Sequence, residues 1–308
     1  METILSTVSL RRLQVFLNVC ETLHMARAAE RLAISQPALS QQIRGLEHAL
    51  GVQLFHRRKR GIDLNAAGEA CRIEAERLLA LHAGAVDAVR RAARGEMGRI
   101  TLGYVSSAMF EQRFPAQLKA MREKFPDVEL SLREGSIATL LAGVEVGDID
   151  VALVRAPIRV ETPLRHRFHS RQDLIVILPS GHRLSEEQEI HISQLASEQM
   201  IGFPDAENVG IMRTAAELAA AAGIQLQVKW QVSEVGSVLG LIAAGLGFGI
   251  VPKDIAHLAG PDVSAHPLAE SGAQTELWLV WHEERMSPAL NQFIGIAASP
   301  QAEDGERR

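Results

Sequence analysis

The chain has 308 residues, of which 47% are hydrophobic and 22% charged, a composition typical of a globular protein with about two domains. No apolar run reaches the roughly 18 residues of a membrane span and no secretory leader is recognisable, so we expect a cytoplasmic protein that does not enter a membrane. The net charge of −5 is uneven, since residues 1–65 carry +4 and the residues after 98 carry −9, which predicts a polyanionic partner for the N-terminal end alone.

Three helices are predicted near the N-terminus. Apolar residues at helical spacing indicate the first around residues 13–20 and the second over about residues 25–32. Ser35 is a good N-cap and Pro37 suits a first turn, so a third helix begins there and ends at Gly51. The buried stripe of this third helix consists of Leu39, Ile43, Leu46 and Leu50.

The other face of the third helix carries short or flexible hydrogen-bonding side chains, the kind that reads base edges in the DNA major groove. The candidate base-reading residues are Gln36, Pro37, Ser40, Gln41 and Arg44. Residues 56–61 form a basic segment between two short apolar runs and predict a wing, a strand pair with a basic tip. The candidate phosphate contacts are Arg31, Ser35, Arg57, Arg58 and Lys59. Each feature alone is more typical of a solvated surface, but their order favours a DNA-binding winged helix-turn-helix over residues 1–65.

A family resemblance is carried by residues 13–16, 28–32, 35–43, 46–47, 51–55 and Arg57. With these residues the chain resembles the LysR-type transcriptional regulators of bacteria. It departs from the usual family pattern at residues 25–26, where Met-Ala replaces the common Phe-Thr, and at residues 65–66, where Asn-Ala replaces Thr-Glu. Asn65 still suits the N-cap of the next helix. The resemblance implies sequence-specific binding to double-stranded DNA at a dyad-symmetric operator, with RNA polymerase as a further candidate partner.

A long helix is predicted over residues 66–95, which contain no proline. Its apolar positions alternate spacings of four and three residues, the pattern of a coiled-coil seam. The seam consists of Cys71, Ala75, Leu78, His82, Ala85, Val89 and Ala92, and the candidate dimer contacts among them are Cys71, Leu78, Ala85 and Val89. The alternative is a helix packed on its own domain. The resemblance implies a dimerising linker helix and effector domains that also pair, so we expect a homodimer that assembles into a homotetramer.

The C-terminal part, residues 96–300, alternates predicted strands and helices, which favours two α/β lobes whose parallel sheets are covered on both faces. Strands are expected at residues 99–105, 128–132, 149–154, 174–178, 200–201, 225–230, 248–251 and 277–281. Helices are expected at residues 114–125, 137–146, 211–222 and 288–298 and from about residue 234. The first lobe is expected over residues 99–168 and 266–300 and the second over residues 169–265, followed by a disordered tail at 301–308.

The C-terminal part resembles the effector domain of the LysR family in residues 99–104, 125–128, 147–153 and 241–252. The resemblance implies the two-lobed fold of the periplasmic substrate-binding proteins. The segments around Arg155 and residues 234–245 look like the branch of the family that senses aromatic-degradation metabolites. That second resemblance implies an aromatic or dicarboxylate effector.

Candidate effector-binding residues follow the predicted strands, where ligands of α/β sheets lie beside helix N-termini that favour anions. They are Ser106, Ser107, Gly135, Ser136, Arg155, Phe203, Pro204 and Glu234. Hydroxyl groups, a guanidinium and an aromatic wall suit a small organic carboxylate bound between the lobes. Two alternatives stay open: the serines cap helices, and Arg155 forms a structural salt bridge with Glu234.

Neither an enzyme nor a cofactor or metal site is predicted. The glycines at positions 245, 247 and 249 follow a predicted helix and open a strand, the reverse of a dinucleotide-binding fingerprint. Cys20 and Cys71 have no metal-ligand spacing, and His166 and His169 fall in a segment expected to be an irregular crossover. Residues 1–65 argue against a stand-alone solute-binding protein. An architectural DNA binder without a ligand is the remaining alternative, which ligand-dependent footprinting distinguishes.

Overall fold

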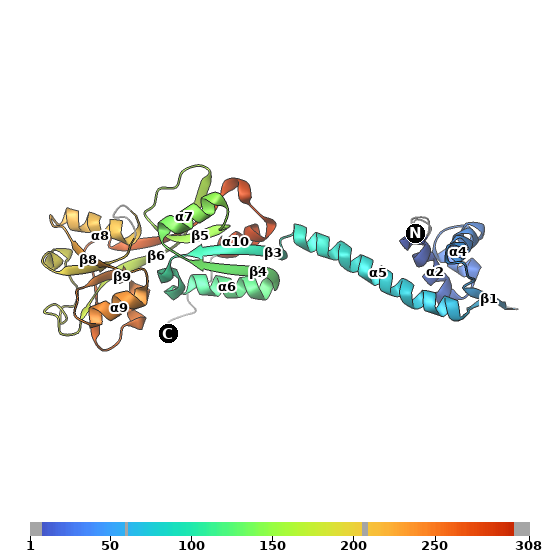
Figure 1. Cartoon of the computed structure of the whole chain (residues 1–308), viewed down its shortest axis with the longest axis horizontal. Helices are drawn as coiled ribbons and strands as arrows, with labels where there is room; N and C mark the ends of the chain where they lie inside the picture. The colour runs from blue at the N-terminus through green and yellow to red at the C-terminus, as the bar shows by residue number, and fades with distance from the viewer. Residues whose placement is uncertain (1–7, 59–60, 205–208, 299–308) are drawn as a thin grey trace, which may run out of the picture. The chain divides into compact units, whose positions relative to one another are not determined.

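The computed structural model describes residues 8–58, 61–204 and 209–298, and the chain divides into two units, Met1–Arg90 and Arg91–Arg308 (Figure 1). The predicted phosphate contact Lys59 and the expected tail at 301–308 lie outside the described residues. Within the described part of the chain, no helix is long and apolar enough to cross a membrane.

The three predicted helices are present in the N-terminal unit: α2 (Leu10–Thr22), α3 (Met25–Arg31) and α4 (Gln36–Leu50). The caps of α4 are the expected ones, since the Ser35 hydroxyl accepts a hydrogen bond from the Ala38 N–H and Gly51 ends the helix. The apolar faces meet in a core whose largest buried side chains are Phe16, Leu39, Leu46 and Leu54. Of the predicted α4 stripe only Leu50 is exposed, because it lies in the last turn of the helix.

The wing is a two-stranded antiparallel sheet of β1 (Phe55–Arg58) and β2 (Gly61–Leu64). Glu47 Oε1 of α4 accepts a hydrogen bond from the Leu54 N–H at 2.8 Å. The Leu23 carbonyl, just after α2, accepts one from the Ile62 N–H at 3.2 Å. Gly61 has a φ of 101°, and a Cβ there would stand 2.9 Å from the Leu23 oxygen, so this close approach needs glycine. These contacts hold the wing against the helices.

The long helix α5 (Ala66–Ala93) has 28 residues and begins after Asn65, whose side chain accepts a hydrogen bond from the Gly68 N–H at 2.7 Å. Its first turns pack on the core of the N-terminal unit, where Ala75 is 1% exposed and Cys71 is partly buried. Cys71 thus contacts its own domain in part, because the start of α5 follows directly on the wing, and its predicted place in the dimer seam stays a prediction.

Beyond Ala75 most apolar side chains of α5 are exposed in the structure, although Leu79 is half-buried. Leu78 is 47% exposed, Leu81 71% and Val89 72%. Leu81 was absent from the predicted seam, because the alternation of four and three residues passes through His82 instead. The exposed stripe of α5 therefore consists of Leu78, Leu81, Ala85 and Val89.

The C-terminal unit is built on a seven-stranded sheet of the order β10-β6-β11-β5-β3-β4, in which β9 also pairs with β6. Its strands, as far as the structure describes the chain, are β3 (Met97–Tyr104), β4 (Asp127–Glu134), β5 (Val151–Ala156), β6 (Leu164–Pro179), β9 (Gly249–Pro252), β10 (Val263–Pro267) and β11 (Gln274–His282). A separate parallel sheet joins β7 (Gln199–Gly202) to β8 (Gln227–Gln231).

Helices cover both faces of the first lobe. The longer helices of the unit are α6 (Arg113–Lys124), α7 (Ile137–Val146), α8 (Gly210–Ala221), α9 (Val235–Ala243) and α10 (Pro288–Ala298). The short 3-10 helices are η1 (Ser106–Phe110), η2 (Ile192–Leu195), η3 (Lys253–Leu258) and η4 (Glu283–Arg285). Figure 1 shows α7 and α6 on opposite sides of β3 to β5. Separate hydrophobic cores, around Phe114 and Phe293 in one lobe and Phe248 in the other, give the expected two lobes.

The strand directions correct the predicted parallel sheets. β3, β4 and β5 run parallel, as do β7 and β8, but β9, β10 and β11 pair antiparallel with their neighbours. These three strands pair with β6, and β11 also with β5, but none of them pairs with another of the three. The prediction that every strand lies in a parallel sheet is therefore wrong for β9, β10 and β11.

The 16-residue strand β6 runs from the first lobe into the second, whereas the prediction covered only residues 174–178. The segment that holds His166 and His169 was expected to be an irregular crossover, which is wrong, because residues 164–173 form the first half of β6. This half of β6 pairs with β11 alone among the described strands, so many of its charged side chains are exposed. Residues 174–178 lie between β9 and β10 and are buried. The apolar run at residues 174–178 covers only the half of β6 that pairs with a strand on each side.

Candidate functional site

The predicted base-reading residues lie on the outer face of α4. Gln36, Pro37, Gln41 and Arg44 are exposed and Ser40 is half-buried. A hollow of ≈ 960 Å³ lies between α4 and the wing. Of the predicted DNA contacts it is lined by Gln36, Ser40, Arg44, Arg57 and Arg58. Pro37 and Gln41 lie outside this lining, on the same helix.

Some of the predicted phosphate contacts already form ion pairs with carboxylates of the protein, and others do not. Arg58 pairs with Asp63 across the wing, and Arg31 pairs with Glu21 at 2.6 Å. Arg57 is exposed and takes part in none of the ion pairs that the structure describes. Arg57 therefore presents the less compensated positive charge of the two described wing arginines.

Sequence reasoning did not assign four polar residues of this hollow to DNA binding. His24, Glu47, Gln53 and His56 also line it. His56 directly precedes the basic run of the wing, a signal that was available, whereas His24 and Gln53 carry no pattern of their own.

All eight predicted effector residues line one cavity of ≈ 660 Å³ in the C-terminal unit. Ser106 and Ser107 come from η1, Gly135 and Ser136 from the start of α7, and Arg155 from β5. Phe203, Pro204 and Glu234 come from the second lobe, after β7 and before α9. The residues that the sequence did not single out are Val105, Glu134, Ile137, Thr139, Ile211, Met212 and Ser233. The cavity thus lies between the two lobes.

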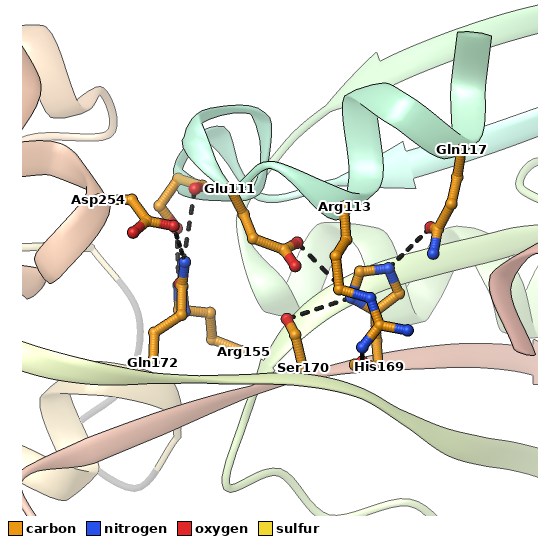
Figure 2. Close-up of polar contacts among 9 residues, drawn as sticks. Glu111, Arg113, Gln117, Arg155, His169, Ser170, Gln172 and Asp254 are labelled. Carbon is orange, nitrogen blue, oxygen red and sulfur yellow. Dashed lines mark hydrogen bonds and ion pairs between the residues drawn. The ribbon is translucent and has the colours of Figure 1, made fainter. Parts of the chain in front are cut away.

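Arg155 is a buried cation, only 2% exposed. Its Nε donates to Ser107 Oγ at 2.7 Å and its Nη2 to Gln172 Oε1 at 2.8 Å (Figure 2). Its Nη1 is buried and has no hydrogen-bond partner in the described part of the chain. Burial lowers the pKa of Arg155 to about 9, against the opposing effect of the carboxylates of Glu111 and Asp254.

The two alternatives left open by the sequence have different outcomes. Among the described residues, Arg155 forms no ion pair with Glu234; its partners are Ser107 and Gln172. Ser136 does cap a helix, because its hydroxyl accepts a hydrogen bond from the Thr139 N–H at 3.3 Å. Ser107 Oγ accepts from Arg155, which leaves its own proton free to donate.

Gln172 connects the two lobes through its amide. This residue of β6 accepts a hydrogen bond from Arg155 of the first lobe and donates one to Asp254 of η3, in the second lobe (Figure 2). Sequence reasoning missed both Gln172 and Asp254. A single glutamine in a charged segment has no spacing that distinguishes it from a solvated side chain.

A second buried polar cluster surrounds His169 (Figure 2). Its Nε2 lies 2.8 Å from Gln117 Oε1 and its Nδ1 3.6 Å from Glu111 Oε2. Arg113 donates to the His169 carbonyl at 2.7 Å. Burial, aided by the positive charge of Arg113, lowers the pKa of His169 to about 4, and burial raises the pKa of Glu111. His169 is thus an interior residue of β6, contrary to the expected irregular crossover.

Comparison with protein families gives a match to each half of the chain. Residues 10–69 match the bacterial regulatory helix-turn-helix proteins of the lysR family. Residues 93–299 match the LysR substrate binding domain. Together these matches cover both the winged helix-turn-helix and the two-lobed unit.

Individual relatives match over nearly the whole chain. The HTH-type transcriptional regulator BudR of Raoultella terrigena is 31% identical over 287 residues, 93% of this chain and 99% of that protein. The HTH-type transcriptional regulator TfdS of Cupriavidus pinatubonensis is 32% identical over 288 residues, 93% of this chain and 97% of that protein.

Solved structures show the same full-length fold. The crystal structure of CbnR, a LysR family transcriptional regulator, superposes with a TM-score of 0.83 at 27% identity and covers 94% of this chain and 100% of that one. Full-length CbnR in complex with its target DNA gives a TM-score of 0.80 at 26% identity, covering 94% and 98% of the two chains.

Proposed function

This chain belongs to the LysR family of DNA-binding transcriptional regulators, and from that membership we propose that α4 and the wing recognise a dyad-symmetric operator while a small organic anion in the interlobe cavity controls the response. The chain has an effector-binding domain, so the proposal concerns the residues that contact DNA and the chemistry of the effector. The CbnR complex with target DNA supports a DNA partner for the related N-terminal unit.

The observation that carries the effector proposal is the buried guanidinium of Arg155. Its Nη1 has no hydrogen-bond partner in the described chain although the residue lines the cavity. A buried charge of this kind costs several kcal/mol unless it is paired. A bound carboxylate supplies the missing acceptor for Nη1 and adds a negative charge next to the guanidinium. The N-terminus of α7 and the Ser107 hydroxyl favour the same ligand group.

The lining and the volume of the cavity support a ligand with an apolar part. Phe203, Ile211 and Met212 of the second lobe and Val105 and Ile137 of the first are among its lining residues. Its volume of ≈ 660 Å³ lies in the range of small-molecule sites. An aliphatic or aromatic carboxylate therefore matches both the charge at Arg155 and the apolar wall.

Calorimetry on the full-length protein with benzoate and hexanoate tests this assignment. Arg155→Gln should weaken carboxylate binding by about 10-fold or more, because it removes the buried charge. Arg165→Gln is the matched control, since Arg165 is an exposed arginine that pairs with Glu283 away from the cavity. If both variants bind the carboxylates as the wild type does, the binding site lies elsewhere.

The exposed stripe of α5 supports a homodimer that pairs along this helix, and pairing of the effector domains would extend it to a homotetramer. Leu78, Leu81 and Val89 expose more apolar surface than a monomeric helix needs. A coiled coil buries such a stripe against the same residues of a second chain.

A further inference from the structure

The interlobe cavity contains two carboxylates besides the Arg155 guanidinium. Glu134 ends β4 in the first lobe, and Glu234 directly precedes α9 in the second. Both residues are exposed. Neither takes part in any ion pair that the structure describes. Two unneutralised negative charges therefore border the site from opposite lobes.

The charges of the described lining residues add to −1, because Arg155 is their only cation. Its charge is also shared with Glu111 and Asp254, which oppose the effect of burial on its pKa. A monocarboxylate ligand raises the negative charge of the cavity by one, and a dicarboxylate raises it by two. Like charges brought together in a partly desolvated space repel. The cavity is thus poorly suited to a dianion.

The charges also differ in depth. Arg155 is buried, whereas Glu134 and Glu234 are exposed at the rim. Apolar side chains, including Phe203 and Met212, line the space with them. A ligand that satisfies all these groups has a carboxylate at one end, an apolar middle and a cationic group at the other end.

We propose that the effector is an amino carboxylate, whose ammonium group is recognised by Glu134 and Glu234. The inference rests on the proposed anion site at Arg155. It adds that the ligand bound there carries an ammonium group at its other end. Because the two carboxylates belong to different lobes, an ammonium group between them removes a repulsion that opposes closure. A ligand with an ammonium group therefore favours the closed arrangement of the lobes more than a ligand without one.

Three six-carbon ligands of equal length separate the charge types: hexanoate, 6-aminohexanoate and adipate. Calorimetry on the full-length protein should give 6-aminohexanoate about 3- to 10-fold tighter binding than hexanoate, with adipate weakest, since each exposed pair contributes modestly. Benzoate, 4-(aminomethyl)benzoate and terephthalate form the equivalent aromatic series. High salt should reduce the differences between the three charge types.

The double variant Glu134→Gln, Glu234→Gln should abolish the preference, weakening 6-aminohexanoate and strengthening adipate. Glu129→Gln is the control, because Glu129 is an exposed carboxylate of the same strand β4 that does not line the cavity. A merely structural role for the two glutamates would change all three ligands alike.

The outcomes distinguish this inference from the proposal beneath it. If adipate binds as tightly as 6-aminohexanoate and the double variant changes nothing, while Arg155→Gln abolishes binding, the ammonium site is overturned and the anion site stands. If no member of either series binds, or Arg155→Gln leaves binding intact, both are overturned. If the wild type prefers the amino carboxylates and the double variant does not, both the anion site and the ammonium site are supported.

Discussion

At the scale of single residues, the polar side chains of the C-terminal unit divide by burial. Arg155 and His169 sit inside the protein, where an unpaired charge is costly, and their pKa values are lowered by that burial. Arg155 still keeps its proton at neutral pH, because about 9 lies well above 7. His169, with a pKa of about 4, is neutral there. One buried group therefore offers a charge to a ligand, and the other serves as an uncharged internal hydrogen-bonding residue.

The lowered pKa of His169 predicts a loss of stability in acid. An unfolded chain takes up this proton near pH 6.5, whereas the folded protein takes it up only near 4. The stabilising contribution is complete above pH 6.5 and is lost as the pH falls toward 4. The free energy of unfolding should fall by up to about 3 kcal/mol over this window, at roughly 1.4 kcal/mol per pKa unit. Urea unfolding at about pH 7 and pH 5 should show about 2 kcal/mol of this fall.

Variants separate this effect from general acid unfolding. His169→Gln should show a shallower loss between the two pH values, and His257→Gln, which alters an exposed residue of η3, should match the wild type. Glu111 acts in the opposite sense. Its raised pKa stabilises the folded protein in acid and that contribution is lost as the pH rises, so Glu111→Gln should steepen the acid loss. Identical slopes in all four proteins would refute the assignment.

The DNA-binding residues should separate into two functional classes. Gln36→Ala removes a candidate base contact and should relax sequence preference by about 1–3 kcal/mol. Arg57→Ala removes an uncompensated wing cation, so it should weaken all DNA sequences similarly and reduce the salt slope by about one. Fluorescence anisotropy on operator and scrambled duplexes measures both. Equal loss of preference in the two variants would contradict the division.

Arg58 provides an internal comparison. Because Asp63 already neutralises it, Arg58→Ala should weaken DNA binding less than Arg57→Ala. Asp63→Asn should free Arg58 and tighten binding to every duplex. Asp63→Asn binding at wild-type strength would show that the pair does not compete with DNA.

At the scale of elements, α5 has two different surfaces along its length. Its first turns complete the core of the N-terminal unit through Ala75, and its later turns expose the stripe that begins at Leu78. The same sequence periodicity covers both regions, because a helix packed on its own domain and a helix in a coiled coil bury similarly spaced residues.

Leu78→Glu should dissociate the proposed dimer. It places two like charges in an interface that excludes water, so light scattering should report the monomer mass and operator affinity should collapse. Ala80→Glu is the control, since Ala80 is exposed and lies about 200° around the helix from Leu78. An unchanged mass for Leu78→Glu would remove this stripe from the assembly.

The strand β6 acts as the connection between lobes through Gln172. Gln172→Glu should place a carboxylate beside Arg155 and opposite Asp254. That carboxylate would neutralise the cation that we propose binds the effector. Affinity for the carboxylate ligands should fall by about 10-fold. Gln227→Glu, an exposed change on β8, is the control for added charge. Calorimetry showing unchanged affinity for Gln172→Glu would mean that this contact does not limit the charge available to a ligand.

At the scale of the whole molecule, the function requires that ligand binding in one unit changes DNA binding by the other. A ligand has this effect only if it favours one arrangement of the lobes over another. The cavity meets the requirement in part, since its lining residues come from both lobes.

An effective ligand should change the bend of operator DNA without abolishing binding. Gel mobility of circularly permuted operator fragments, with and without ligand, measures the bend. Arg155→Gln should bind the same DNA and show no ligand-dependent change. If the wild type binds a ligand and the bend remains constant, the alternative of a constitutive architectural DNA binder is favoured.

The sequence alone was sufficient wherever the relevant interaction is local. Ser35 and Asn65 were identified as caps because a cap bonds within three residues of itself. The eight candidate effector residues line one cavity because the ends of parallel strands converge at one edge of a sheet, and each strand end is visible in the local pattern. The family resemblance, carried by contiguous residues, is likewise a property of the sequence.

The tertiary structure decided the contacts that join distant parts of the chain. Arg155 bonds to Ser107, 48 residues away, and to Gln172, 17 residues away, while Gln172 reaches Asp254 across 82 positions. Cys71 packs in part on its own domain, and β6, with 16 residues, is about three times as long as its apolar run at residues 174–178 suggested. Periodicity records which face of an element is buried, but not which partner buries it. That partner is set by chain closure and by the pairing of strands, so the charge environment of Arg155 became visible only in the folded molecule.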